Sequence, residues 1–299
     1  MNKIVYFMTL GGILAFFLLI ALIAFFVVQN SMSGIFGTLD LDGLDKTDGN
    51  VVNILTVGVD GSETRSDTVI LASINMKTKK VSMLSIPRDT RVKYNGKYDK
   101  LTHLFSYDTT GQLTLDTVKE ITGAEINYMA IINFDGFSNA IDELGGIDIE
   151  VPDLGNGGMY YDDPVQDLHI ALEAGYQHLD GQQAQGFVRY RKGYANADIG
   201  RNETQRYFLS ELINQKLKFK YILKLPAVLN TLEGDFKTNY TFKETFYQLI
   251  HMIGISGDSV NSYSLPGESQ MASTRYGILS CYIYDEKATQ KLVSNYFSE

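Results

Sequence analysis

The chain has 299 residues, 44% of them hydrophobic and 20% charged, which is the composition of a folded protein with one sizeable α/β domain or two small ones. Its formal net charge of -9 argues against general affinity for the phosphate backbone of nucleic acid. The single cysteine, Cys281, excludes an internal disulfide and a cysteine-rich zinc site.

The first element in the chain is an uncharged apolar run at residues 4–28. It is longer than the roughly 20 residues that span a bilayer core. It is also too long for a cleaved signal peptide, and no small-residue cleavage pattern follows it. We therefore expect a retained transmembrane anchor, in preference to a cleaved signal or a buried core helix.

The charges that flank this run predict its orientation. Lys3 precedes it, and no Lys or Arg follows until Lys46. The positive-inside rule then predicts residues 1–3 in the cytoplasm and the remainder outside the cell. We expect a single-pass protein of the cell membrane with an extracytoplasmic C-terminal domain. One thiol without a disulfide suits a Gram-positive bacterium.

Residues 29–49 are rich in Gly, Ser and Asp and are expected to form a stalk. Strand and helix patterns alternate through 50–299, which we interpret as one domain because no linker interrupts it. The strand patterns lie at 51–59, 68–74, 81–86, 128–133, 147–151 and 260–265, with a hairpin through 76–80. The helix patterns lie at 113–121, after Asp135, from Asp180 to Tyr190, at 202–217, around 222–232, from Thr241 and after Asp285. Together they predict an α/β fold, with a mixed central β-sheet sandwiched between helices.

The eight arginines are unevenly placed, whereas the lysines are more spread out. Seven arginines fall within 65–91 and 189–206. A planar guanidinium grips phosphate oxygens bidentately, which a lysine cannot do, so the clustering indicates an anion site. The alternative is that these arginines lie on solvated helix faces, paired with nearby carboxylates. Arg275 lies outside both stretches and is expected to tolerate replacement by Lys.

The contexts of the first stretch favour a site at the strand ends. Asp60 ends the 51–59 strand, Asp67 precedes the next strand and Arg88 follows the third. In open α/β sheets, ligands bind beyond strand ends, where loops bring charged groups together. Asp60 and Asp67 could hold one Mg²⁺, which prefers one or two carboxylates plus substrate phosphate oxygens. The alternative is that the two aspartates are structural, one capping a turn and the other capping the entry to a strand.

The second stretch points to a helix terminus. Arg189 and Arg191 cannot share one helix face, so we expect them where a helix ends. Arg201 and Gln205 are four residues apart and share a face. Arg201 is expected just ahead of a helix start, where backbone N–H groups attract anions.

Taken in order and spacing, these segments resemble the LytR–CpsA–Psr (LCP) family of Gram-positive wall-glycan transferases. The resemblance covers about residues 50–215. It rests on Gly58-Val59-Asp60, Arg65-Ser66-Asp67-Thr68, Ser85-Ile86-Pro87-Arg88-Asp89, Lys100-Leu101-Thr102-His103, Ile141-Asp142-Glu143-Leu144-Gly145-Gly146, Leu179-Asp180-Gly181-Gln182-Gln183-Ala184, Arg189-Tyr190-Arg191, Asp198-Ile199-Gly200-Arg201 and Gln205.

The resemblance implies a deep apolar pocket for a polyprenyl tail, with Asp60 and Asp67 holding Mg²⁺ (or Mn²⁺) at a pyrophosphate. The catalytic residues it implies are Asp60, Asp67, Arg88, Arg189, Arg191, Asp198 and Arg201. The substrate-binding residues it implies are Arg65, Arg88, Lys100, Arg189, Arg191, Arg201 and Gln205. Asp198 is expected to orient the arginines or to act as a base. Family members usually carry an arginine where this chain has Thr204, and the resemblance leaves open whether Arg206 takes its place.

The implied activity is that of a phosphotransferase. It would move a glycan phosphate from a polyprenyl (undecaprenyl) pyrophosphate carrier to peptidoglycan and so attach teichoic acid, capsule or a similar wall polymer. The expected partners are that lipid-linked glycan, the peptidoglycan acceptor and the membrane, but not nucleic acid. Two alternatives stay open. One is a pyrophosphatase that transfers the same group to water, and the other is a membrane-bound regulator of transcription.

Overall fold

The computed structural model describes residues 37–44, 50–60, 64–164, 168–190, 194 and 197–297, and of 37–38 and 197–202 only the backbone path is described. The predicted anchor at 4–28, residues 1–3 and most of the predicted stalk lie outside the described residues. Within the described part of the chain, no helix is long and apolar enough to cross a membrane.

A seven-stranded mixed sheet forms the centre of the molecule, in the order β1-β12-β7-β2-β3-β4-β13. Its strands are β1 (Gly37–Thr38), β2 (Val51–Val59), β3 (Ser66–Asn75), β4 (Lys80–Ile86), β7 (Tyr128–Asn133), β12 (Phe236–Thr238) and β13 (Val260–Ser264). β3 pairs antiparallel with both β2 and β4, whereas β7 runs parallel to β2 and β13 parallel to β4. The predicted strands, the hairpin through 76–80 and the mixed character of the sheet are confirmed.

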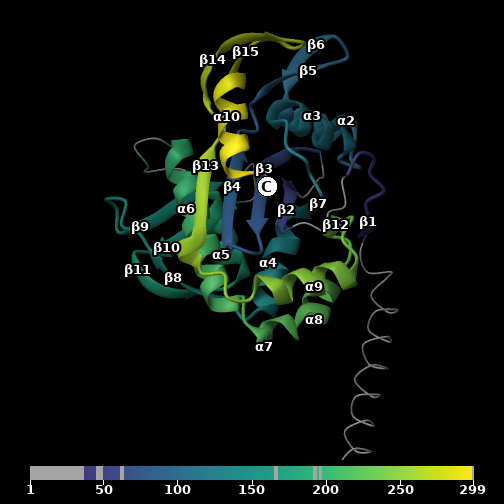
Figure 1. The fold of residues 1–299 in the computed structure, drawn as a ribbon. Helices are drawn as coiled ribbons and strands as arrows, with labels where there is room; N and C mark the ends of the chain where they lie inside the picture. Colours follow the sequence, from purple (N-terminus) through teal and green to yellow (C-terminus); the bar gives the residue numbers. More distant parts are fainter. Residues whose placement is uncertain are drawn as a thin grey trace, which may run out of the picture.

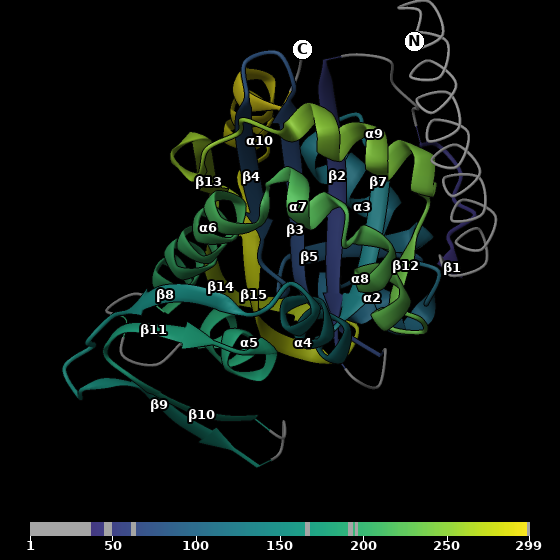
Figure 2. The same ribbon diagram turned by 90° about the horizontal axis from the view of Figure 1, so that it is seen from below.

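Helices cover both faces of this sheet (Figures 1 and 2). On one face lie α2 (Leu101–Tyr107), α3 (Gln112–Thr122) and α10 (Glu286–Tyr296), over a core that includes Leu55, Leu71 and Leu84, each with no exposed surface. On the other face lie α4 (Phe134–Glu143), α5 (Gly181–Arg189), α6 (Ala197–Lys216), α7 (Phe219–Ile222), α8 (Leu225–Thr231) and α9 (Phe242–Met252). Each fully buried leucine stabilises the fold by roughly 1.5–3 kcal/mol, so the first face is the main hydrophobic core.

Four two-stranded antiparallel ribbons extend from this framework, three of them hairpins of consecutive strands and one (β8–β11) closed around the β9–β10 hairpin. They are β5–β6 (Arg91–Tyr94, Lys97–Lys100), β8–β11 (Ile147–Val151, Gly175–Leu179), β9–β10 (Gly158–Asp163, Leu168–Glu173) and β14–β15 (Gly267–Thr274, Gly277–Tyr284), with a short 3₁₀ turn η1 at Gly257–Ser259. The strand predicted at 147–151 exists, but it pairs with β11 and is not part of the central sheet. The sequence analysis did not predict the other strands of these ribbons. β14 and β15 bury few side chains and so show little alternation, whereas β10 alternates buried and exposed residues along its length and was overlooked.

Three helix boundaries differ from the prediction. Asn133 caps α4, since its Oδ1 accepts a 2.8 Å hydrogen bond from the Gly136 amide, and Asp135 lies in the first turn. The helix predicted around 222–232 is two shorter helices, because Pro226 can begin α8 but cannot continue α7. α6 begins at Ala197, so Arg201 lies inside a helix and not ahead of one. The helix starts predicted at Asp180 and Thr241 are confirmed, and each is closed by a capping box.

Candidate active site

A cavity of about 530 Å³ lies between the sheet and α6. Side chains alternate along each strand, so one set faces this cavity and the other faces the main core. In β3, Ile70, Ala72 and Ile74 line the cavity, whereas Val69 and Leu71 lie in the core. From α6, Phe208, Leu209, Leu212 and Ile213 complete an apolar wall. The cavity can therefore hold an extended apolar group.

Asp67 reaches the cavity through an irregularity in the sheet. Gly58 pairs with Thr68 and Val59 with Ser66, so Asp67 is one extra residue in β3. Regular alternation would send an odd-numbered β3 side chain to the core, as it does for Val69. The bulge instead leaves Asp67 in the cavity lining beside Thr68. One polar end of the cavity is thus set by a β-bulge.

Arg88 joins Asp67 at this end. It follows β4, and its Nη1 lies 2.5 Å from Asp67 Oδ1. The Arg88 side chain keeps 35% of its surface exposed, so the pair is open to solvent at the cavity mouth. The Arg88 carbonyl accepts a 2.9 Å hydrogen bond from the Thr102 amide at the start of α2, which fixes the loop.

Arg189 is the second guanidinium of the cavity, and α5 positions it. α5 packs closely on α4, since a Cβ on Gly181 would collide with the Ser138 carbonyl. Arg189 is the last residue of α5, where the helix dipole favours a cation. Its guanidinium carbon lies 4.0 Å from the centre of the Phe134 ring, and Nη1 donates to Gln185 Oε1 at 3.1 Å.

The charge of Arg189 is only partly compensated. Burial lowers the pKa of its guanidinium, and the negative charges of Asp67 and Asp163 offset part of that effect. Among the described residues, no carboxylate oxygen lies within ion-pair distance of it. The described cavity lining contains two guanidiniums and one carboxylate. Because a desolvated cation gains from an anionic partner, this end of the cavity favours a phosphate-like group.

Asp60 has a structural role in the loop beyond β2. Its Oδ1 accepts hydrogen bonds from the amides of Thr64 (2.9 Å) and Arg65 (3.2 Å), and the Thr64 hydroxyl lies 3.3 Å from Oδ2. Asp60 is not among the residues that line the cavity. This is the turn cap that the sequence left open as an alternative.

The residues present are a partial fit to a divalent cation. In the described part of the chain, no group of three or more His, Cys, Asp or Glu side chains could hold a metal ion. Mg²⁺ commonly takes one or two carboxylates and completes its octahedron with water and substrate phosphate oxygens. Asp60 and Asp67 flank one loop and fit that open form, with Asp67 Oδ1 already in contact with Arg88.

The other predicted site residues have mixed outcomes. Gln205 lines the cavity, and its Nε2 donates to the Val188 carbonyl at 3.3 Å. Arg65 is exposed and does not line the cavity. Lys100 also lies away from the lining, because its Nζ pairs with Asp89 Oδ1 at 2.7 Å. Asp198 and Arg201 belong to the part of α6 whose side chains are not described, and Arg191 lies outside the described residues.

Arg206 does not supply the guanidinium that is missing at Thr204. Thr204 is buried, and its hydroxyl lies 2.6 Å from that of Tyr194. Arg206 is exposed and is not among the cavity-lining residues. Neither residue therefore brings a guanidinium into the cavity lining.

The sequence prediction missed Gln185 and Asn133 among the polar residues that line the cavity. Gln185 accepts the hydrogen bond from Arg189 and donates to the Phe134 carbonyl at 2.9 Å. Asn133 lines the cavity while it caps α4. The spacing of Gln185 and Arg189, one helical turn apart, is a signal that could have identified the first of them.

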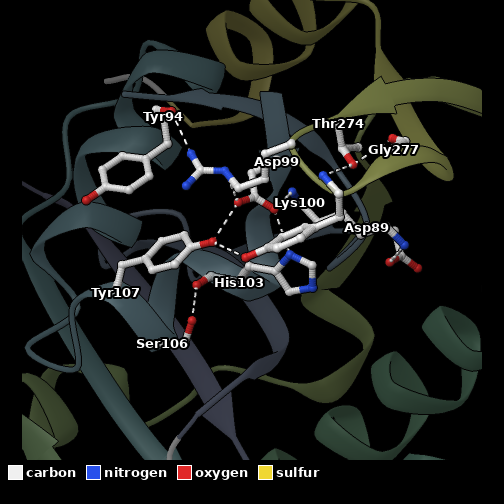
Figure 3. A network of polar contacts seen from close by, with 11 residues as sticks. Asp89, Tyr94, Asp99, Lys100, His103, Ser106, Tyr107, Thr274 and Gly277 are labelled. Carbon is white, nitrogen blue, oxygen red and sulfur yellow. Dashed lines mark hydrogen bonds and ion pairs between the residues drawn. The ribbon is translucent and has the colours of Figure 1, made fainter. Parts of the chain in front are cut away.

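A buried polar network lies beside this site, between α2, β5–β6 and β14–β15 (Figure 3). Asp99 has no exposed side-chain surface and contacts His103 Nδ1 at 2.6 Å, the Tyr107 hydroxyl at 2.9 Å and Arg275 Nε at 2.8 Å. His103 is thus a structural residue here. Arg275 is held in this network, so its surroundings do not support the expectation that it tolerates Lys.

Comparison with known proteins agrees with this architecture. The model of the LytR_cpsA_psr family matches residues 30–297. The chain is 30% identical over 301 residues to the polyisoprenyl-teichoic acid–peptidoglycan teichoic acid transferase TagU of Oceanobacillus iheyensis, covering 93% of this chain and 89% of the relative. It is 32% identical to TagU of Bacillus subtilis, over 64% of this chain and 60% of that protein.

Two solved structures share the fold at 25% identity. B. subtilis TagV superposes with a TM-score of 0.67, covering 84% of this chain and 98% of that one. TagT bound to LIIa-WTA superposes with a TM-score of 0.65, covering 84% of this chain and 92% of that one. The match of the family model over nearly the whole chain, together with the shared fold, shows that this chain belongs to the LytR_cpsA_psr family.

Proposed function

We propose that this protein is a transferase that moves a glycan phosphate from a polyprenyl-pyrophosphate carrier to peptidoglycan. The observation that carries the proposal is one cavity with an apolar wall along β3 and α6 and two guanidiniums, Arg88 and Arg189, at its polar end. That pairing suits a molecule with a long hydrocarbon tail and a pyrophosphate head. The names of the TagU and TagT relatives support teichoic acid as the transferred polymer.

The proposed reaction is a displacement at phosphorus. A hydroxyl oxygen of the acceptor glycan forms a bond to the phosphorus that carries the donor glycan. The bond from that phosphorus to the bridging oxygen breaks, and polyprenyl phosphate leaves with the bonding electron pair. The hydroxyl proton passes to a carboxylate, for which we propose Asp198. No nucleotide is consumed, because the pyrophosphate bond supplies the driving force.

Arg88 and Arg189 act on the charge of the phosphate oxygens. Each guanidinium can donate two parallel hydrogen bonds to one phosphate. Arg189 is already desolvated, so its attraction to developing negative charge is stronger than it would be in water. Gln185 and Phe134 hold its side chain before substrate arrives. Preorganisation of this kind lowers the barrier without reorganisation during the reaction.

A divalent cation completes the proposal. Asp67 and Asp60 would hold Mg²⁺, with Mn²⁺ as a substitute, and the bound ion would neutralise charge on the leaving phosphate. We also propose that residues 4–28 anchor the protein in the cell membrane, with residues 50–299 outside the cytoplasm. This location would bring the cavity to a membrane-borne donor.

The test is product analysis with a labelled polyprenyl-pyrophosphate glycan and the full-length chain. In the presence of peptidoglycan fragments we expect glycan linked to them through a phosphate, together with polyprenyl monophosphate, by mass spectrometry. Release of free glycan phosphate at an equal rate without the acceptor would overturn the proposal in favour of a pyrophosphatase. Arg206→Lys is the matched control, since Arg206 lies outside the cavity.

A further inference from the structure

The helical face formed by α7 and α9 has unusual surface chemistry for an acidic protein. α7 and α9 lie side by side at the base of the molecule in Figure 1, and they face the viewer in Figure 2. Five large apolar side chains are exposed on them and the segments that follow them: Phe219 (59%), Leu223 (62%), Tyr247 (62%), Ile250 (37%) and Ile253 (37%). We call these five residues the apolar patch. In the described part of the chain, between 37% and 62% of the surface of each of these side chains stays exposed.

Lysines surround this patch. Residues 216–232 contain Lys216, Lys218, Lys220 and Lys224 and no acidic residue, although the whole chain has a formal net charge of -9. Lys218, Lys220 and Lys224 are exposed, as is Lys243 on α9. The sequence pattern had indicated spread-out lysines, but these lie on one face. The only acidic residue of α9, Glu244, is tied into the capping box at Thr241.

The turn between β3 and β4 extends the positive surface. Lys79 Nζ donates to the His251 carbonyl at the end of α9, which places this turn against that helix. Lys77 and Lys80 in the same segment are exposed. A local positive potential is also evident at Tyr221. Burial tends to raise the pKa of its hydroxyl, but the ammonium groups of Lys216 and Lys220 hold that pKa below its ordinary value.

The apolar end of the cavity lies directly behind the patch. Met252 of α9 and Ile213 of α6 line the cavity, and Ile74 and Val81 line it where β3 and β4 approach their turn. Met252 lies between the exposed Ile250 and Ile253 in the chain. A hydrocarbon chain in the cavity would therefore have its far end close to the apolar patch, opposite the guanidiniums.

We propose that the α7–α9 face docks on an anionic lipid bilayer, with the apolar patch at the acyl boundary and the surrounding lysines among the headgroup phosphates. Exposed aromatic and aliphatic side chains ringed by lysines are the pattern of interfacial membrane segments. Clustered lysines near a bilayer are attracted by anionic lipids over about a Debye length. This contact is additional to the predicted anchor. Its use in guiding a lipid tail into the cavity rests on the proposed function, whereas the docking itself does not.

The absence of tryptophan from the chain provides a clean reporter. Phe219→Trp places a single tryptophan in the patch, and Ile278→Trp places one at a 70% exposed site on β15. Each full-length variant is reconstituted into vesicles of phosphatidylcholine, alone or mixed in equal parts with phosphatidylglycerol, that carry brominated acyl chains. We expect bromine quenching and a blue shift for Phe219→Trp in the mixed vesicles, and neither for Ile278→Trp.

The lysines are tested in the same assay. In the Phe219→Trp background, Lys218→Glu with Lys220→Glu should reduce quenching, since each lost lysine shifts the docked-to-undocked ratio about fivefold. Lys287→Glu with Lys291→Glu on the opposite face is the control and should leave quenching unchanged. Raising the salt from about 0.1 M to about 1 M should also weaken quenching.

Equal quenching at the two tryptophan positions would overturn the proposal. Quenching that changes neither with phosphatidylglycerol content nor with Lys218→Glu and Lys220→Glu would overturn it as well. Self-association in detergent that Phe219→Ser abolishes, without lipid quenching, would assign the patch to a second copy of the chain and also overturn it. These vesicles contain no glycan donor or acceptor. A failure of glycan transfer would therefore leave the docking result intact, and a failure of docking would leave transfer testable.

Discussion

The Nε atom of Arg275 lies 2.8 Å from Oδ2 of Asp99, a carboxylate with no exposed side-chain surface. The two residues are far apart in sequence, and the pair joins β14–β15 to the β5–β6 hairpin and α2. Nη2 of Arg275 also donates to the Tyr94 carbonyl at 2.7 Å, and its guanidinium carbon lies 5.2 Å from the centres of the Tyr94 and Tyr107 rings. Arg275 thus stabilises the part of the fold that carries the Arg88 loop.

Arg275→Ala should lower the free energy of unfolding by about 3–5 kcal/mol, because it leaves a buried carboxylate without its cation. Arg275→Lys should recover only part of this, since an ammonium cannot reproduce the fork or the ring contacts. Urea unfolding midpoints measure both changes. Arg206→Lys, at an exposed arginine, is the control and should stay within about 0.5 kcal/mol of wild type. Equal midpoints for Arg275→Ala and Arg206→Lys would contradict the role of the pair.

Acid should destabilise the fold through two carboxylates. Burial raises the pKa of Asp99, but hydrogen bonds from His103, the Lys100 amide and Tyr107 more than offset this and hold it below the ordinary value. Burial likewise raises the pKa of Asp108, and hydrogen bonds from Thr110 and the Leu113 amide bring it below that value. Because both folded-state pKa values are depressed, their stabilisation is complete above the unfolded pKa of about 4 and is lost as pH falls below it.

The measurement is the free energy of unfolding as a function of pH. It should fall below about pH 4, and Asp108→Asn should make that decline shallower. Asp116→Asn, at an exposed aspartate on α3, is the matched control and should leave the slope as it is. If Asp108→Asn loses stability with falling pH as steeply as the wild type, this carboxylate does not contribute to the pH dependence.

Arg88→Lys and Arg189→Lys should each reduce glycan transfer about tenfold to a hundredfold. Each change keeps a positive charge but removes a bidentate contact worth roughly 1.5–3 kcal/mol. Initial rates with a labelled lipid-linked donor measure the effect, and a thermal melt checks that the fold is retained. Wild-type rates in both variants, alongside Arg206→Lys, would remove the main support for the phosphate site.

Asp67 and Asp60 should differ in their effect on stability although both are proposed to hold the cation. Asp67→Asn should weaken Mn²⁺ binding, measured by the electron paramagnetic resonance of free Mn²⁺, with little change in melting. Asp60→Ala should also weaken Mn²⁺ binding. In addition it should lower the free energy of unfolding by about 1 kcal/mol, because it removes the hydrogen-bond acceptor of two backbone amides. Mn²⁺ affinity equal to wild type in both variants would exclude these carboxylates as ligands.

Ala72→Phe should block the apolar part of the cavity from the strand side. A ring there occupies space that a long prenyl chain needs, so transfer from long-chain donors should fall by about tenfold or more. Donors with a short prenyl chain should react at nearly the wild-type rate. Ala272→Phe on β14, remote from the cavity, is the matched control. An equal loss with both donors would show that the tail does not occupy this part of the cavity.

Local sequence determined most of the secondary structure. The strands at 51–59 and 81–86 have long β-branched or apolar runs, and the capping boxes at Asp180 and Thr241 mark helix starts by short-range hydrogen bonds. Such signals depend on residues within one helical turn or one strand, so they are visible before folding. The two arginine stretches also indicated an anion site, and Arg88, Arg189 and Gln205 do line one cavity.

Only the tertiary structure decided which charged residues have which neighbours. The β-bulge that turns Asp67 into the cavity depends on the pairing of β2 with β3, and the burial of Arg275 depends on a ribbon that meets α2 from far away in the chain. Contacts between distant segments also produce the ion pair that holds Lys100 away from the cavity. The same kind of contact gathers lysines on the α7–α9 face. The sequence specifies local preferences, whereas charge compensation and burial depend on contacts between distant segments, which exist only once the chain has packed.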